Sequence, residues 1–257
     1  MNKIFPTASA AVSDLESGQR FAVGGFGLSG VPFSLIAAVH ELGIDNLEIV
    51  SNNCGTDGRG LGVLLSSNRI RRIVASYVGE NREFARRYLG GELEVELTPQ
   101  GTLAERLRAA GAGIPAFYTP AGVGTQVETG GLPWLYDRHS DVVTASPPRE
   151  TRDFELGHRA GTYLLETALP CDVGLVRAWR GDRFGNLIFR KSARNFNPLC
   201  AMASALVIAE VEELSETALD PDAVHLPGIY VNRIVTLPPE HAADKPIEKL
   251  TTTEASS

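Results

Sequence analysis

The chain has 257 residues, and its 31 acidic against 24 basic side chains leave a formal net charge of −7. This balance gives no support to a nucleic-acid or anionic-membrane partner, because either would need a basic face. The three cysteines, Cys54, Cys171 and Cys200, are too scattered for a disulfide framework. No apolar run reaches membrane-spanning length and no long apolar segment opens the chain, so we expect a soluble protein of a reducing cytoplasm.

The first half of the chain alternates short apolar strands with helical segments. We predict strands over residues 20–24, 47–50, 70–78, 92–98 and 115–119, and helices over residues 7–18, 32–42, 60–65, 81–89 and 103–110. Within 92–98, three apolar residues alternate with Glu92, Glu94 and Glu96, which indicates a half-buried strand with a solvated acidic face. The order of elements predicts an α/β fold with an open, largely parallel, Rossmann-like sheet flanked by helices.

Residues 120–160 break this rhythm with glycines and prolines, which predict loops and one or two hairpins. Further strands are predicted at 163–165, 173–179, 187–189 and 205–211, with a hairpin turn over 181–186 and a helix over 198–203. From Pro238 the sequence is polar, and we expect residues 251–257 to be disordered. The organisation is therefore one domain over residues 1–237, with a looped hairpin insertion in its second half, and a polar tail over 238–257.

A glycine-rich stretch follows the first long strand of this prediction. It consists of Gly24, Gly25, Phe26, Gly27, Leu28, Ser29 and Gly30, and Pro32 then opens a helix. Glycine lets a ligand approach the backbone, and the free N–H groups of a helix's first turn favour a phosphate or carboxylate. Three interpretations stay open at this point: an anion-contacting loop, a purely structural turn and a dinucleotide site.

The dinucleotide interpretation rests on residues 25–30, which fit the pattern G-x-G-x-x-G between a strand and a helix. Such a site also needs an acidic residue at the end of the second strand to hold a ribose hydroxyl. Here that strand ends in Ser51-Asn52-Asn53, and Asp57 lies well beyond it. The missing acid weakens the dinucleotide interpretation.

Amide side chains follow two of the predicted strands. Asn52 and Asn53 stand at the carboxyl end of strand 47–50, where ligands of open α/β sheets bind, and their amides can donate to a carboxylate or carbonyl. Gln100 stands at an equivalent place after strand 92–98, where its amide can donate to a developing oxyanion. The alternative for all three is a local role as a turn or helix cap.

The other reactive side chains give weaker signals. Glu80 follows a strand and is a tempting nucleophile, although a glutamate there commonly interacts with a helix dipole. Cys54 lacks a neighbouring histidine and is expected to be a packed small residue. The basic segment 190–197 fits a phosphate, another subunit or plain solvent. The histidines show no metal-ligand spacing and are expected to have surface or capping roles: His40, His139, His158, His225 and His241.

Six segments together resemble one known family. They are residues 24–32 (GGFGLSGVP), 51–53 (SNN), 76–81 (SYVGEN), 92–106 (ELEVELTPQGTLAER), 115–120 (PAFYTP) and 189–197 (FRKSARNFN). They span most of residues 4–237 and resemble the α-subunit of family I coenzyme A transferases, of the type that acts on succinyl-CoA and a 3-oxoacid.

This resemblance implies a parallel-sheet subunit that pairs with a homologous β-subunit, commonly as an α2β2 heterotetramer. It also implies ping-pong chemistry, in which a glutamate attacks the thioester, forms a mixed anhydride and then carries CoA as an enzyme thioester. In the family that glutamate belongs to the β-subunit, in a motif that this chain lacks, so Glu80 is not expected to be the nucleophile. No cofactor or metal is implied, because the CoA thioester is a substrate.

The resemblance also implies roles for single residues. The loop from Gly24 to Gly30 matches the family's CoA- and substrate-contacting loop, and Gln100 matches the glutamine of the oxyanion hole. Asn52 and Asn53 match positions that line the carboxylate pocket. Ser29 departs from the pattern, since many relatives carry cysteine there, and this bears only on thiol reactivity.

Two other function classes compete with this one. A non-catalytic module that binds CoA or a sugar phosphate would share the fold, and a dinucleotide-dependent oxidoreductase would use the glycine pattern. Neither class accounts for the matches around Gln100 and Asn195. The sequence does not distinguish acetoacetate from 3-oxoadipate as the acceptor.

Overall fold

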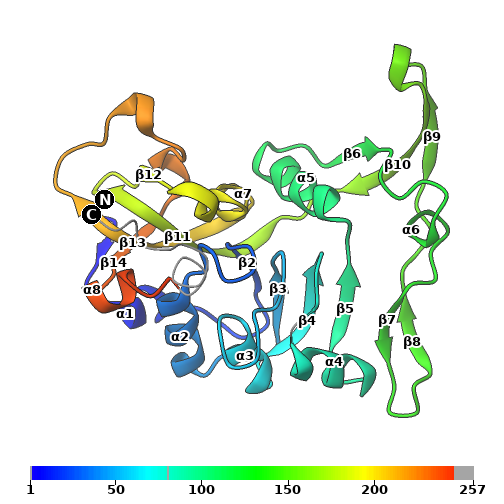
Figure 1. The fold of residues 1–257 in the computed structure, drawn as a ribbon, viewed down its shortest axis with the longest axis horizontal. Coiled ribbons are helices and arrows are strands. Elements are labelled where there is room, and N and C mark those ends of the chain that lie inside the picture. Colours follow the sequence, from blue (N-terminus) through cyan, green and yellow to red (C-terminus); the bar gives the residue numbers. More distant parts are fainter. Residues whose placement is uncertain (1, 80, 246–257) are drawn as a thin grey trace, which may run out of the picture.

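A large parallel sheet forms the centre of the protein (Figure 1). The computed structural model describes residues 2–79 and 81–245. In that part of the chain nine strands form the sheet, in the order β1-β14-β13-β11-β2-β3-β4-β5, with β12 paired antiparallel to β11 and every other pairing parallel. The strands are β1 (Ile4–Phe5), β2 (Arg20–Val23), β3 (Leu47–Val50), β4 (Ile70–Ala75), β5 (Glu94–Leu97), β11 (Cys171–Asp182), β12 (Leu187–Ile188), β13 (Ser204–Ser215) and β14 (Arg233–Thr236).

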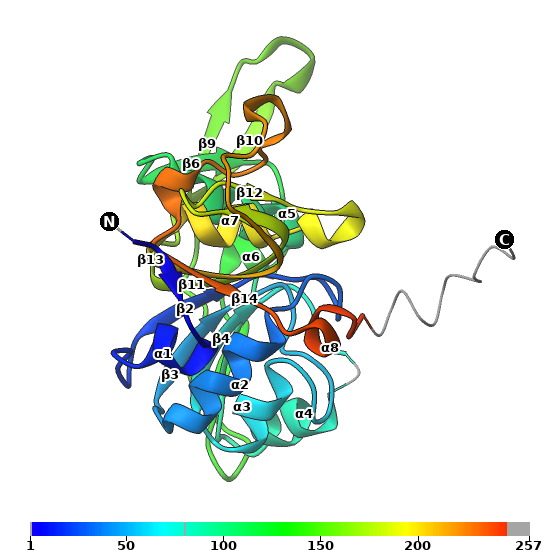
Figure 2. The same cartoon turned by 90° about the vertical axis from the view of Figure 1, so that its left-hand side faces the viewer.

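Helices cover both faces of this sheet (Figure 2). One face carries α1 (Ala8–Val12), α2 (Phe33–Leu42), α3 (Gly62–Ser66) and α4 (Arg82–Leu89), and the other carries α5 (Gln100–Gly111) and α7 (Asn197–Met202). Successive side chains of a strand point to opposite faces. In β2, Phe21 and Val23 therefore join the core under α2, whereas Ala22 joins the core under α5 and α7. The predicted α/β architecture is confirmed.

The insertion leaves the main sheet as an arm, which Figure 1 shows in green at the right. It holds a three-stranded antiparallel sheet, β6-β10-β9, and a hairpin, β7-β8. Its elements are β6 (Ala116–Thr119), α6 (Gln126–Thr129), β7 (Pro133–Tyr136), β8 (Val142–Ala145), β9 (Thr151–Phe154), η1 (Gly157–Arg159) and β10 (Gly161–Thr167). The predicted hairpins are confirmed. The predicted strand 115–119, however, pairs with β10 in the arm instead of continuing the parallel sheet.

The remaining elements are short. They are η2 (Lys191–Arg194), η3 (Pro221–Ala223), η4 (Gly228–Tyr230) and α8 (Pro239–Ala242). Because α8 lies beyond residue 237, the start of the predicted polar tail is structured, while the prediction for 251–257 falls outside the described residues. No helix in residues 2–79 and 81–245 is long and apolar enough to cross a membrane.

The acidic face predicted for residues 92–98 is wrong at Glu96. The residue is 4% exposed, whereas Leu97, predicted to be buried, is 46% exposed. Helix α5 covers this side of β5 and brings Arg106 within 2.6 Å of the Glu96 carboxylate, which also accepts a hydrogen bond from Arg72. Burial raises the pKa of Glu96, but these arginines and Arg149 outweigh burial and hold the pKa below its usual range.

This ion cluster yields a prediction for stability. Glu96→Ala leaves the buried Arg106 without its main partner, so we expect the free energy of unfolding to fall by about 3 kcal/mol or more. Glu94→Ala, on the same strand but partly exposed, is the matched control and should cost about 1 kcal/mol or less. Urea unfolding of both variants measures the difference, and equal losses would contradict the structural role of Glu96.

Candidate active site at the carboxyl edge of the sheet

The glycine loop forms a tight turn directly after β2. Its tip is closed by two backbone hydrogen bonds between Phe26 and Ser29, of 3.0 and 2.9 Å, and the Phe26 side chain is 45% exposed. Gly30 has a φ of +69°, and a Cβ there would lie 2.7 Å from the carbonyl oxygen of Ala193. Both the left-handed backbone and the close neighbour therefore require glycine at this position.

The segment 190–197 holds this loop in place. The buried Asn197 donates through Nδ2 to the carbonyls of Gly30 (2.9 Å) and Ala193 (2.8 Å), and its Oδ1 accepts from the backbone N–H of Arg177. Asn195 donates to the Ser29 carbonyl at 3.0 Å. The sequence alone is compatible with a phosphate contact, a subunit contact or a solvated loop here. In the structure the segment packs against the glycine loop. In the sequence, the only signal for this role is its two asparagines, Asn195 and Asn197.

The first turn of α2 already contacts a carboxyl group of the protein itself. The carboxylate of the buried Glu210, on β13, accepts from the backbone N–H of Leu35 at 3.0 Å and from that of Ser34. Burial raises the pKa of Glu210 to about 7, opposed by the charge of Arg177, whose Nη1 lies 3.7 Å from the carboxylate. The helix terminus that the sequence suggests as an anion site is therefore internally filled. A ligand at the glycine loop would therefore have to bind to the loop and the side chains around it, and not to the N–H groups of Ser34 and Leu35.

The structure brings the predicted amide residues together. Asn52 and Asn53 follow β3 and are both buried, and Gln100 is the first residue of α5 and is exposed. The Nδ2 of Asn52 lies 2.7 Å from Ser76 Oγ and 3.4 Å from Gln100 Oε1. Asn53 approaches the Gly27 carbonyl at 3.4 Å. Loops after β2, β3, β4 and β5 thus meet at one edge of the sheet.

An open hollow of about 310 Å³ lies at this edge. Its lining combines the glycine loop, the start of α5 and the segment before α7, namely Phe26, Gln100, Gly101, Ala104, Asn195, Phe196 and Leu199. Most of this lining is apolar, and the amides of Gln100 and Asn195 are its polar groups. Such a composition fits an organic ligand that is oriented by a few hydrogen bonds.

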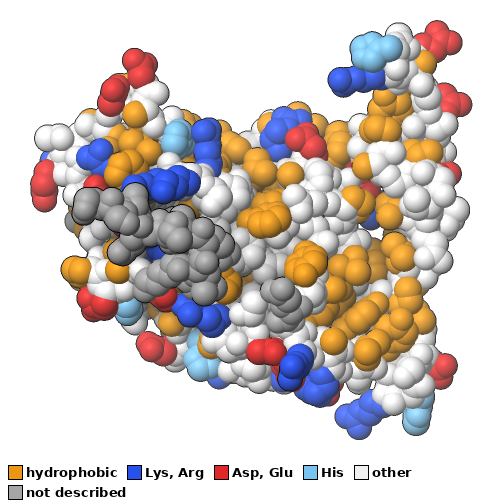
Figure 3. All heavy atoms as spheres, viewed as in Figure 1, with side chains coloured by type: hydrophobic (Ala, Val, Ile, Leu, Met, Phe, Trp, Pro, Cys, Tyr) orange, Lys and Arg blue, Asp and Glu red, His pale blue; other side chains and the backbone are white. Residues whose placement is uncertain are grey.

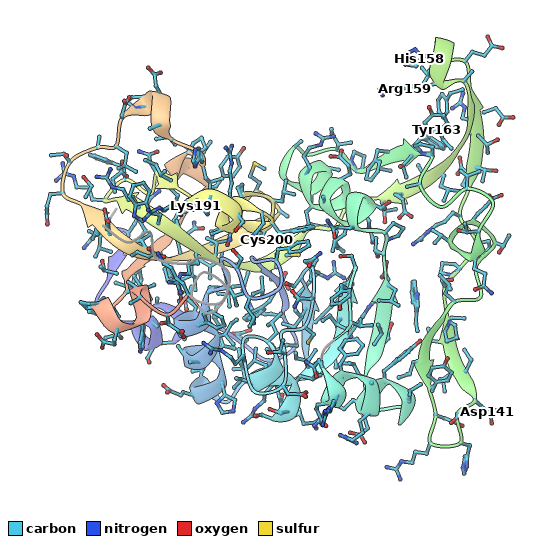
Figure 4. The ribbon with its side chains drawn as sticks, viewed as in Figure 1. Asp141, His158, Arg159, Tyr163, Lys191 and Cys200 are labelled. Atoms are coloured by element: carbon cyan, nitrogen blue, oxygen red, sulfur yellow. The ribbon has the colours of Figure 1, made fainter. Side chains whose placement is uncertain are left out.

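The cysteines are not part of a reactive site. Cys54, Cys171 and Cys200 are all buried, and burial raises the pKa of Cys54 to about 12. The interpretation of Cys54 as a packed residue is confirmed, and Figure 4 shows Cys200 on α7. Among the described residues no group of three His, Cys, Asp or Glu side chains is placed to hold a metal ion. Glu80 lies outside the described residues.

The contact between the glycine loop and α7 yields a second prediction. A Cβ at Gly24 would lie 1.9 Å from Asn197 Oδ1, so Gly24→Ala should displace the loop and reduce the free energy of unfolding by about 1–3 kcal/mol. Gly101→Ala is the control, because nothing lies within 4 Å of its Cβ position in α5. Thermal unfolding should show a loss for the first variant and no loss for the second. Two equally stable variants would contradict the contact.

Comparisons with known proteins identify the family to which this fold belongs. The model of the coenzyme A transferase family matches residues 5–237. The chain is 60% identical over 239 residues to a Mycobacterium tuberculosis protein named as the A-subunit of a probable succinyl-CoA:3-ketoacid coenzyme A transferase, covering 93% of this chain and 95% of that protein. It is 54% identical to the A-subunit of the succinyl-CoA:3-ketoacid coenzyme A transferase of Xanthomonas campestris, covering 91% of this chain and 88% of that protein.

Among solved structures, the acyl-CoA transferase YdiF of Escherichia coli O157:H7 superimposes with a TM-score of 0.75 at 22% identity. The match covers 93% of this chain and 47% of that chain, so the present chain spans about half the length of that protein. An identity this low establishes the shared fold alone. The family match over residues 5–237 and the similar relatives decide the assignment: the chain belongs to the coenzyme A transferase family.

Proposed function

We propose that this chain is the α-subunit of a succinyl-CoA:3-oxoacid CoA-transferase, which moves CoA from succinyl-CoA to acetoacetate or 3-oxoadipate. The hollow that joins Phe26, Gln100 and Asn195 carries this proposal, because a mostly apolar cavity with an oriented amide donor fits a thioester carbonyl. The names of the similar relatives support the same reaction.

In this proposal the chain supplies half of the site. The nucleophilic glutamate comes from a homologous β-subunit, in an α2β2 assembly of the cytoplasm. Its carboxylate oxygen attacks the thioester carbonyl, the C–S bond breaks, and the CoA thiolate departs. The product on the enzyme is a mixed anhydride of succinate and the glutamate. The thiolate then attacks the glutamyl carbonyl, which releases succinate and leaves CoA bound to the glutamate as a thioester. In the second half-reaction the 3-oxoacid takes the place of succinate and the same two steps run backwards, so that the 3-oxoacyl-CoA is released. The CoA thioester is a substrate, and no cofactor takes part.

Gln100 is the residue that would meet the developing oxyanion. Its Oε1 faces Asn52 Nδ2, so the Nε2 donor of the same amide points away from Asn52. Gln100 also begins α5, a helix of 12 residues, so the unpaired N–H groups of its first turn add positive potential where negative charge develops. Asn52 is itself held by a hydrogen bond to Ser76. These contacts hold the Gln100 amide in place before the reaction, so little reorganisation is needed when the oxyanion forms.

The need for a partner is directly testable. The purified chain should form no acetoacetyl-CoA from succinyl-CoA and acetoacetate, because the nucleophile lies on the other subunit. Adding the co-expressed β-subunit should restore turnover, and separate assays of the two isolated proteins serve as controls. Robust turnover by the isolated chain would refute the division of the site.

The role of Gln100 is tested in the assembled enzyme. Gln100→Ala removes one oxyanion donor, so kcat should fall roughly 10²-fold or more. Gln126→Ala, an exposed glutamine of α6 in the arm, is the matched control and should leave kcat unchanged. Steady-state kinetics with both substrates gives the comparison. A kcat unaffected by Gln100→Ala would remove this residue from the mechanism.

A further inference from the structure

Asn197 uses all of its strong hydrogen-bonding groups inside the protein. Its Nδ2 donates to the carbonyls of Gly30 at 2.9 Å and Ala193 at 2.8 Å, and its Oδ1 accepts from the backbone N–H of Arg177 at 2.9 Å. An amide offers two N–H groups and one carbonyl oxygen, so these partners fit asparagine and no carboxylate, hydroxyl or apolar side chain of similar size. The residue is 0% exposed and therefore touches no ligand itself.

The two ends of the glycine loop meet at this side chain. Its Nδ2 holds the carbonyl of Gly30 at one end. At the other end a Cβ on Gly24 would lie 1.9 Å from Oδ1, so the backbone there is in direct contact with the amide. The Gly24 N–H also donates to the Leu175 carbonyl of β11 at 2.9 Å. Phe26 lies between these two ends, and its place follows from them.

The hollow has one wall on each side of this contact. Phe26 of the glycine loop belongs to the first wall, and the second wall is formed by residues 195–199 of the segment that leads into α7. Asn197 stands in the second wall and bonds the first, so it sets the separation of the two. Two further contacts join Ser29 to the second segment, from Ser192 and from Asn195, but they are exposed or only partly buried. A hydrogen bond in the interior is electrostatically stronger than one in contact with water.

We propose that Asn197 is a positioning residue of the transfer reaction, because its amide holds the glycine loop and Phe26 at a fixed distance from Asn195 and α7. This inference rests on the proposed function, which places the reacting thioester between the two walls. A displacement of the loop by about 1 Å would cost roughly 10²-fold in rate, since the thioester carbonyl would no longer face the nucleophile and Gln100 in the productive geometry.

Asn197→Asp in the assembled enzyme tests this role. The carboxylate keeps an acceptor for the Arg177 N–H but places negative charge against two carbonyl oxygens, so kcat should fall roughly 10²-fold at about pH 8. Protonation turns one carboxyl oxygen into an O–H donor that can bond a carbonyl again. Burial raises the pKa of a carboxyl group by as much as about 3–5 units, so the ratio of variant to wild-type kcat should rise as the pH falls toward about 5.5.

The charged groups around Asn197 bear on this pH profile. The glycine loop has no ionisable side chain, and Arg177 on β11 is paired with Glu210 and Glu212. Around η2 stand three exposed cations, Arg190, Lys191 and Arg194. Figure 4 shows Lys191 on the segment that leads into α7, and Figure 3 shows Lys and Arg side chains gathered over the same upper-left region. These cations are screened by water, so burial prevails for the introduced carboxyl group. The ratio to wild type at each pH removes the titration of Glu210, which both enzymes share.

Asn186→Asp is the matched control. Asn186, in the turn between β11 and β12, also uses both polar atoms, since its Nδ2 donates to Asp182 at 2.8 Å and its Oδ1 accepts from the Gly228 N–H at 2.8 Å. The same substitution there faces the buried carboxylate of Asp182, so it should lower stability in urea unfolding and leave kcat unchanged.

A second variant, Asn197→Ser, decides the question if Asn197→Asp does not fold. Its hydroxyl keeps a single donor, so kcat should fall about tenfold, the effect of one lost hydrogen bond. Because serine does not titrate, its ratio to wild-type kcat should stay constant with pH.

Four results would overturn the proposal. They are a wild-type kcat in the folded variant at position 197, a reduced kcat of Asn197→Asp whose ratio to wild type is independent of pH, an equal fall in kcat for Asn186→Asp, or a raised KM with unchanged kcat. If the wild-type pair transfers no CoA, the proposed function fails separately. Hydrogen exchange of residues 24–30 then decides the contact by itself: exchange in Asn197→Asp should exceed that of wild type at the higher pH and approach it at the lower pH. Equal protection at both pH values would refute the hold of Asn197 on the loop.

Discussion

Both polar atoms of the Asn197 side chain form hydrogen bonds inside the protein, and these bonds set the shape of the site. Its Nδ2 bonds the carbonyls of Gly30 and Ala193, and its Oδ1 accepts from the backbone of β11. One buried amide thereby joins the glycine loop, the segment before α7 and the central sheet. A buried polar group left without partners is costly, so this arrangement specifies one loop position rather than many. Gly24 and Gly30 are required because they pack against this junction.

Glu210 adds a second constraint beneath the same loop. A carboxylate with 0% exposure satisfies the N–H groups at the start of α2, and Arg177 lies near it. Arg177 in turn donates to the carbonyls of His241 and Ala242, so α8 is tied to the same cluster. The protein's own carboxyl group thus occupies this helix terminus, and Gln100 and Asn195 line a separate hollow beside the glycine loop.

The geometry of the parallel sheet explains why these residues meet. Strands β2 to β5 all point the same way, so the loops after their carboxyl ends share one edge. The arm begins after α5, whose first residue is Gln100, and the ion cluster of Glu96, Arg106 and Arg149 connects the arm to β5. The same cluster includes Arg106 of α5, so it also joins the arm to the helix that begins at Gln100.

The sequence by itself determined the elements, the parallel sheet of the first half, the glycine turn and the candidate amides Asn52, Asn53 and Gln100. These follow from local signals, namely periodicity, turn residues and position after a strand. Other features required the tertiary structure: the pairing of strand 115–119 within the arm, the burial of Glu96, the filling of the α2 terminus by Glu210 and the role of Asn197. Each of these depends on a partner distant in the sequence. Hydrophobic alternation cannot reveal that a glutamate faces a buried arginine, because both side chains are polar in isolation and become interior only as a pair.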